Sequence, residues 1–110
     1  MPKAYLNLGD ILKSEADPQC RVAVPADPDT KAGTFVDYPL RDQKVVALTD
    51  EVNGEVLIQP HNCVIDLQYI AGANIAAAGF ATVEDLKIEG DAHGIVYINA
   101  PDGPVPNIEG

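Results

Sequence analysis

The chain has 110 residues and contains no tryptophan, and 46% of its residues are apolar. This length fits one domain and leaves no room for a second core. Seven lysines and arginines stand against seventeen aspartates and glutamates, so the net charge is −10. Nucleic acids and anionic membranes are bound through clustered cations, whereas the cations here are scattered. The sequence therefore predicts neither of them as a partner.

No stretch reaches the roughly 18–20 uninterrupted apolar residues that a membrane-spanning helix needs. The N-terminus carries one cation, Lys3, and lacks the apolar segment of a signal peptide. The sequence therefore predicts a protein made in the cytoplasm. Cys20 and Cys63 are too few and too far apart for a disulfide framework. They are interpreted as free, buried thiols.

The N-terminal quarter contains few regular signals. Residues 1–19 are predicted to form an irregular arm, since Asp17-Pro18 would end any short helix begun near Ile11. Residues 21–24 are a brief strand candidate. Residues 25–33 contain two prolines, two aspartates and a glycine, which is typical of a turn-rich loop.

The β-strand signal strengthens in the middle of the chain. Residues 34–40 combine aromatic and β-branched side chains with a proline, which suits an edge strand or a bulge. Two apolar runs, 44–49 and 55–59, lie on either side of Asn53-Gly54, which favours a hairpin because both residues tolerate positive φ. Residues 63–70 alternate as a half-buried strand does. The alternation predicts that the inward side chains are Ile65, Leu67 and Tyr69 and the outward ones are Asp66 and Gln68.

The last third is less regular. Residues 71–81 contain two glycines, which would cost a helix roughly 2 kcal/mol, so extended or looped backbone is favoured. Residues 82–90 begin with the Thr82 and Asp85 spacing of a helix cap, yet they also alternate as a strand does, and both alternatives stay open. Residues 94–99 are the last clear strand.

These elements predict a mainly β fold, a small β-sandwich or barrel with at most one short helix and extended termini. The expected organisation is an N-terminal arm at residues 1–19 and a single β-rich domain at residues 20–99. A Pro- and Gly-rich tail at residues 100–110 completes the chain and is expected to be ordered only by a partner.

No pattern predicts a catalytic site. Ser14, the only serine, lacks the Gly-x-Ser-x-Gly turn of a serine hydrolase. His61 and Cys63 could act as base and nucleophile only on one strand face, and Pro60 favours a turn there instead. We therefore expect no enzymatic activity and neither catalytic nor cofactor-binding residues.

Metal binding is not predicted either. The candidate ligands are His61, Cys63, Asp91 and His93. They include one closely spaced pair, whereas zinc sites are usually marked by two. Asp27-Pro-Asp29 lacks the glycine and the final glutamate of a calcium loop. The carboxylates of residues 84–91 have no aromatic cleft beside them and are interpreted as a solvated acidic face.

One segment, Ala32–Leu67, resembles a known family. Val45-Val-Ala-Leu-Thr-Asp50, followed by Gly54-Glu-Val56 and an apolar strand, is similar to a stretch of capsid decoration (head-stabilising) and head-fibre proteins of tailed bacteriophages. Ala32-Gly-Thr-Phe-Val36 looks like the strand that begins this stretch. In that family the stretch forms a hairpin within a compact β domain.

The resemblance implies a non-enzymatic structural protein on the surface of the virion capsid. It would bind the major capsid protein and cement neighbouring capsomers, often as a homotrimer. The residues expected to contact the capsid or other subunits are Tyr5, Leu6, Leu8, Ile75, Phe80, Val105 and Ile108. The alternatives are another β-rich assembly module, such as a tail or baseplate component, a small ligand-binding module, or a small enzyme that uses Cys63 or a metal.

Overall fold

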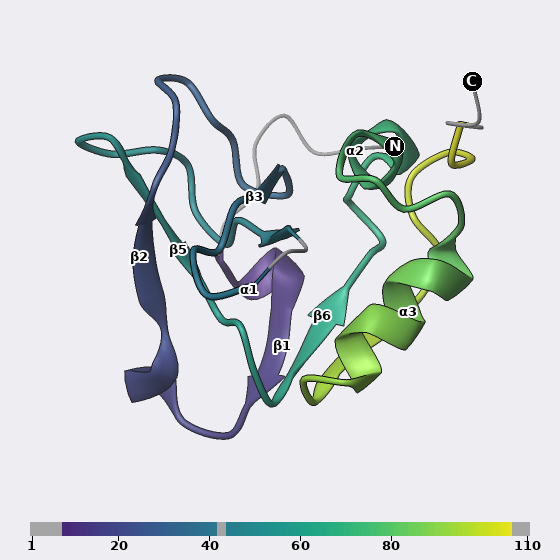
Figure 1. The fold of residues 1–110 in the computed structure, drawn as a ribbon, viewed down its shortest axis with the longest axis horizontal. Coiled ribbons are helices and arrows are strands. Elements are labelled where there is room, and N and C mark those ends of the chain that lie inside the picture. The colour runs from purple at the N-terminus through teal and green to yellow at the C-terminus, as the bar shows by residue number, and fades with distance from the viewer. Residues whose placement is uncertain (1–7, 42–43, 107–110) are drawn as a thin grey trace.

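The structure, a computed structural model, describes residues 8–41 and 44–106 (Figure 1). In chain order the elements are α1 (Leu8–Ile11), β1 (Leu12–Glu15), the 3-10 turn η1 (Pro18–Cys20), β2 (Val22–Pro25), β3 (Phe35–Val36), β4 (Val45–Val46), β5 (Glu55–Ile58), β6 (Cys63–Asp66), α2 (Gly72–Ala77), α3 (Val83–Asp91) and β7 (Ile95–Ile98). Within the described residues the strands form three small sheets. The fold is therefore mixed α/β and rich in β-structure.

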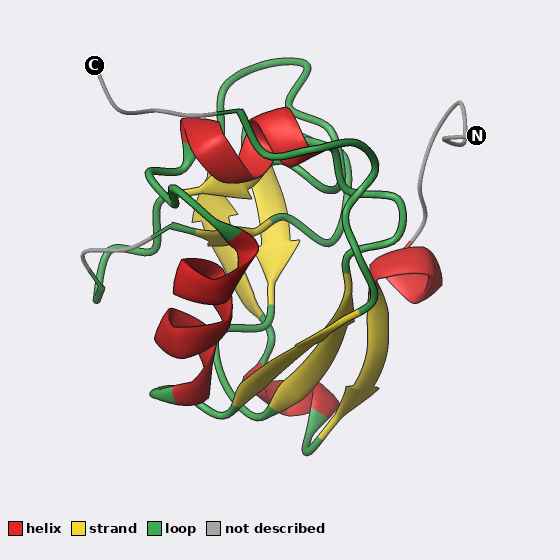
Figure 2. Cartoon of the chain, turned by 90° about the vertical axis from the view of Figure 1, so that its right-hand side faces the viewer, coloured by secondary structure: helices red, strands yellow, loops and turns green. Residues whose placement is uncertain are grey.

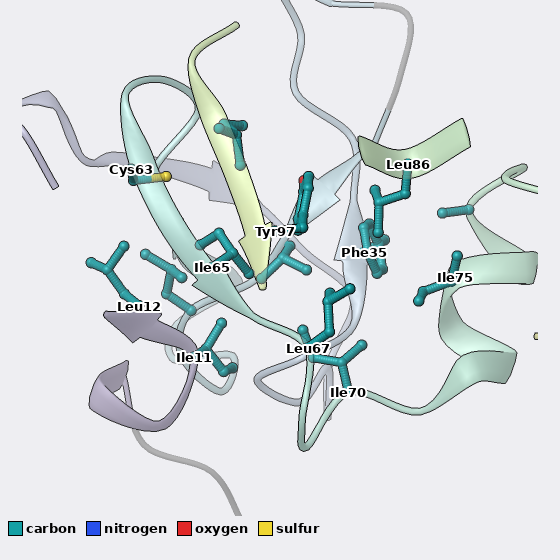
Figure 3. Packing of buried hydrophobic residues seen from close by; sticks show 14 of the residues in the cluster. Ile11, Leu12, Phe35, Cys63, Ile65, Leu67, Ile70, Ile75, Leu86 and Tyr97 are labelled. Carbon is teal, nitrogen blue, oxygen red and sulfur yellow. The ribbon is translucent and has the colours of Figure 1, made fainter. Parts of the chain in front are cut away.

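The largest sheet has the order β1-β6-β7, with β6 at its centre. β6 is antiparallel to β1 and parallel to β7. Parallel neighbours need a crossover connection, and here α2 and α3 provide it. α3 lies against β7 (Figure 2). The main core lies between this sheet and the helices, with Ile65, Tyr97 and Leu86 among its buried members (Figure 3).

A second, smaller core is enclosed by two antiparallel ribbons. β2 pairs with β5, and β3 pairs with β4. The ribbons are joined where the N–H of Leu48 donates to the carbonyl oxygen of Leu57 at 2.8 Å. The buried members of the second core are Val24, Val36, Tyr38, Val45, Ala47, Val56 and Ile58. Sheets of two and three strands make neither a clear sandwich nor a closed barrel, the two architectures that the sequence predicts, and much of the main core is covered by helices.

The turn predicted at Asn53-Gly54 is confirmed. The two residues have φ values of 54° and 82°, and Val52 and Glu55 form an antiparallel bridge across them. Asn-Gly suits this turn because few other pairs adopt two positive φ values in succession. The predicted hairpin between the runs 44–49 and 55–59 is not formed as a strand pair, because β5 pairs with β2 and residues 45–46 pair with β3.

The expectation of extended or looped backbone at residues 71–81 is wrong, because the two glycines flank a helix instead of interrupting it. Gly72 is the first residue of α2, and Gly79, with a φ of 98°, follows its C-terminal end. Glycine is favoured just beyond helix ends because it adopts positive φ without strain. Together with α1 and α3, this helix also exceeds the single short helix that the sequence predicts.

In the segment 82–90, which the sequence leaves open between helix and strand, Thr82 is the N-cap residue of α3 and residues 83–90 are helical. The Thr82 hydroxyl accepts a hydrogen bond from the N–H of Asp85 at 3.1 Å, as the spacing of these two residues indicates. This bond satisfies one of the N–H groups that the first turn of a helix leaves unpaired.

Asp66 was expected to point outward and is buried instead, with 5% of its surface exposed. Its carboxylate accepts hydrogen bonds from the N–H of Gln68 at 2.8 Å and from the side chain of Asn99 at 2.9 Å. The amine of Lys13 on β1 lies 4.0 Å from the other carboxylate oxygen. A buried carboxylate is tolerated there because it is hydrogen-bonded.

Both ends of the described chain pack onto the domain. Residues 8–15, which fall within the expected N-terminal arm, form α1 and the edge strand β1, and Ile11 is fully buried. At the other end the N–H of Asp102 donates to the carbonyl oxygen of Ile70 at 2.8 Å, and Val105 packs against the main core. Residues 102–105 are therefore held by this chain itself, not by a partner as expected.

We expect Gly72→Ala to lower the free energy of unfolding by about 1–3 kcal/mol, because overpacking of a tight contact costs this much. The added methyl would collide with the backbone of Gly103 and Pro104. Gly9→Ala is the matched control in α1, since nothing lies within 4 Å of the new methyl. Urea unfolding of the three proteins measures the difference. Equal stability of Gly72→Ala and the unaltered chain would contradict the contact between α2 and residues 103–104.

Candidate functional site

The residues weighed as nucleophiles lie in surroundings that do not activate them. Cys63 is buried, its Sγ lies 3.5 Å from the carbonyl oxygen of Gln59, and burial raises the pKa of its thiol to about 11. Since the thiolate is the reactive form, this thiol is protonated at neutral pH. His61 is exposed, and its ring stands edge-on to Tyr38 at 6.3 Å. Ser14 is exposed on β1.

The two cysteines have different environments. Both are free, as predicted, but only Cys63 is buried. Cys20 is exposed in η1, so the expectation of a buried thiol is wrong at this position. The η1 turn lies in the connection between β1 and β2, outside both cores.

The candidate metal ligands do not come together. His93 lies 3.1 Å from a carboxylate oxygen of Glu89, one helical turn away, whereas His61 lies beside Tyr38. Across residues 8–41 and 44–106, no group of three or more His, Cys, Asp or Glu side chains is placed to hold a metal ion.

Arg41 links the second core to α3. Its side chain is 7% exposed, and its guanidinium donates to the carbonyl oxygen of Pro60 at 2.6 Å and lies 5.3 Å from the centre of the Tyr38 ring. Its Nη1 is 4.0 Å from a carboxylate oxygen of Glu89 and forms no hydrogen bond. A cation can be buried in this way because a carboxylate and an aromatic face compensate its charge. The cluster therefore holds the ribbons against the helix.

A second polar cluster lies where the chain passes between the main sheet and the ribbons. Nε of Arg21 donates to both carboxylate oxygens of Glu15, at 3.0 and 3.1 Å, and its Nη2 makes a further short contact with Glu15. The buried Gln59 side chain also donates to Glu15, at 2.8 Å. The hydrogen bond from Arg21 is the main cause that holds the pKa of Glu15 below its usual value of 4.5. We call these three residues the polar junction.

The residues predicted to contact partners differ in how deeply they are buried. Ile75 is 0% and Phe80 is 4% exposed, so both belong to the main core and offer no surface to a partner. Leu8 and Val105 are partly buried and pack against the same core. The remaining predicted contacts, Tyr5, Leu6 and Ile108, lie outside the described residues.

A polar hollow of about 320 Å³ lies between the loop after β2 and strand β3. Asp27, Asp37 and Lys44 are among its lining residues, and the amine of Lys44 pairs with Asp37 at 2.8 Å. In the same loop the carbonyl oxygen of Asp27 accepts hydrogen bonds from the N–H and the hydroxyl of Thr30, at 3.2 and 2.7 Å. These bonds are those of a turn, as the sequence indicates for Asp27-Pro-Asp29.

A second hollow, of about 290 Å³, has a mostly apolar wall and lies on the side of the β2–β5 ribbon that faces away from the second core. Its lining residues are Ala23, Thr49, Asp50, Val52, Glu55, Val56 and Leu57. Val56 is 2% exposed and belongs to the second core, and we call the other six the outer ribbon face. Sequence reasoning missed this surface. The available signal was the alternation of residues 55–58, which places Leu57 on the same side of the strand as the exposed Glu55.

Comparisons with protein-family models, with curated proteins and with solved structures find no match to this chain. No helix within residues 8–41 and 44–106 has the length and apolar character needed to cross a membrane.

We expect Glu15→Gln to lower the free energy of unfolding at pH 7 by about 1 kcal/mol, a modest value because Arg21 is 29% exposed and solvent screens the pair. The folded-state pKa of Glu15 lies below 4.5, so its stabilisation is complete above that pH and is lost as the pH falls through the folded value. The stability of the variant should accordingly fall less between pH 5 and pH 3.

Asp37→Asn is the control, because it removes a carboxylate that is 85% exposed. Its effect on stability should stay below about 0.5 kcal/mol. Urea unfolding at a series of pH values measures both variants. Parallel pH profiles for Glu15→Gln and the unaltered chain would contradict a lowered pKa at Glu15.

The two thiols should react at very different rates with a disulfide reagent at pH 8. Cys20 is exposed and should react in a fast phase, whereas the burial of Cys63 and its pKa of about 11 should leave that thiol unreacted until the chain unfolds. Cys20→Ser should abolish the fast phase. Two fast thiols in the native protein would contradict the buried position of Cys63.

Proposed function

We propose that this chain is a non-enzymatic structural protein of a tailed bacteriophage, one that binds the outer surface of the capsid and cements neighbouring capsomers. Its partner is the major capsid protein, its working form is a homotrimer, and its place is the surface of the virion. The observation that carries the proposal is the resemblance of residues 32–67 to capsid decoration and head-fibre proteins.

The structure supports the proposal by the way it uses this segment. Residues 32–67 form a continuous unit that runs through β3, β4, the Asn53-Gly54 turn, β5 and β6. The unit supplies most of the second core and the central strand of the main sheet. The segment that carries the resemblance thus contributes to both cores of the domain.

The charge and the burial of the chain fit the same role. A net charge of −10 keeps free copies apart in solution and favours docking onto a basic surface. A chain of 110 residues buries a limited core, so contacts with neighbouring subunits would add stability. Both features suit a small protein that is made free and then held by a large assembly.

The test is the number of copies in purified particles of the phage that encodes the chain, measured by quantitative mass spectrometry against the major capsid protein. We expect hundreds of copies per particle, as a protein that covers the capsid requires. A few copies per particle would assign the chain to the tail or baseplate instead, and its absence from particles would overturn the proposal.

Solution mass, measured by light scattering on a sizing column, tests the trimer separately. Three times 11.7 kDa supports a trimer that forms before docking. A mass of 11.7 kDa for the free chain and its presence on capsids in multiples of three would instead place trimer formation on the capsid.

A further inference from the structure

The two sides of the β2–β5 ribbon are used differently. Successive side chains of a strand point to opposite faces, and Val24 and Val56 point into the second core, where each is 2% exposed. Their neighbours Ala23 and Leu57 are paired across the ribbon and face the other way. An aliphatic pair therefore lies on the outer face, where Ala23 is exposed and Leu57 is half-buried.

Val52 extends this apolar surface. It is 66% exposed at the Asn53-Gly54 turn and lines the same hollow as Ala23 and Leu57. Most exposed aliphatic side chains of a domain are scattered singly and need no explanation. Here the exposed valine stands beside a hollow of about 290 Å³ with a mostly apolar wall, which is large enough to receive one or two side chains of a partner.

The loop that carries Val52 is held in place by its own acidic residues. The carboxylate of Glu51 accepts hydrogen bonds from the N–H of Gly54 at 2.6 Å and of Asp29 at 3.3 Å. The carboxylate of Asp50 accepts one from the N–H of Ala32 at 2.9 Å. The surface is therefore already formed in the free chain, so binding has little ordering cost.

The charges around the hollow select its partner. Asp50 and Glu55 line it, Glu51 lies between them in the sequence, and the described lining residues include no lysine or arginine. A second copy of this chain would bring carboxylates against carboxylates on a molecule whose net charge is already −10. A basic surface that carries an apolar side chain complements both the hollow and its rim.

We propose that the outer ribbon face is the docking surface of this chain, and that its occupant is an aliphatic or aromatic side chain flanked by lysine or arginine on the outer surface of the capsid. This inference rests on the proposed function, because it takes the partner from it. Ile75 and Phe80 are buried and are no longer contact residues in this proposal. The proposed contact residues are Val52 and Leu57 at the centre of the outer ribbon face and Glu55 at its rim.

The test uses the full-length chain and capsids that lack it, obtained from phage in which its gene is deleted, with co-sedimentation as the measure of affinity. We expect Val52→Lys to weaken binding at least ~10-fold, because it removes the apolar contact and places a cation against a basic surface. Glu55→Gln should weaken binding less and should reduce its dependence on salt concentration.

Ile88→Lys is the matched control. Ile88 is also β-branched, it is 65% exposed against 66% for Val52, and it lies on α3, away from the ribbon. The same change of charge at Ile88 should leave the affinity for capsids within about twofold. This variant therefore measures the general effect of an added cation on binding. Thermal unfolding of each variant within about 2 °C of the unaltered chain shows that the fold is kept.

The outcomes separate the two proposals. If the unaltered chain binds and Val52→Lys binds as tightly as Ile88→Lys, the outer ribbon face is not the docking surface, although the chain still decorates capsids. If the unaltered chain does not bind such capsids, the proposed function fails and this surface loses its partner. If Val52→Lys lowers the solution mass of the free chain, the face is a contact between copies and the basic partner is wrong.

Discussion

The arrangement of this fold depends on the place where two passages of the chain cross between its two cores. One passage joins β1 to β2 and the other joins β5 to β6, and the N–H of Ala16 donates to the carbonyl oxygen of Asn62 at 2.9 Å between them. The polar junction of Glu15, Arg21 and Gln59 fastens the same place. Buried polar groups are costly unless they are hydrogen-bonded, so the junction permits few other alignments of the two passages.

The junction leaves the ribbons attached at one end, and Arg41 attaches them at another. Its guanidinium lies between Tyr38 of the second core and Glu89 of α3. With both attachments made, the inner side of the β2–β5 ribbon is committed to the second core, and its outer side carries the hollow lined by Ala23 and Leu57. The exposed Val52 and the half-buried Leu57 are thus a consequence of how the two cores are joined.

What the sequence could predict was local. Asn53-Gly54 and the Thr82–Asp85 cap depend on the conformations of neighbouring residues. The turn is confirmed, and the cap is one of the two alternatives that the sequence leaves open for residues 82–90. α2 and Asp66 depend on distant contacts, and both were missed. Gly72 is required where residues 103–104 approach the helix, and the burial of Asp66 depends on Asn99, far along the chain. Neither contact has a signature in the segment that it determines.

Among the residues expected to contact a partner, too, some positions depend on distant parts of the chain and others on their own strand. Apolar residues in a segment of small side chains, such as Ile75 and Phe80, can serve either a core or an interface, and only the path of the chain decides between them. Leu57 is a different case, because the alternation of its own strand places it opposite the buried Val56 and Ile58. A two-stranded ribbon can bury one face in its own core. An aliphatic residue in the outward register of such a ribbon, beside an acidic turn, is therefore better evidence for a partner than an apolar residue whose face is unknown.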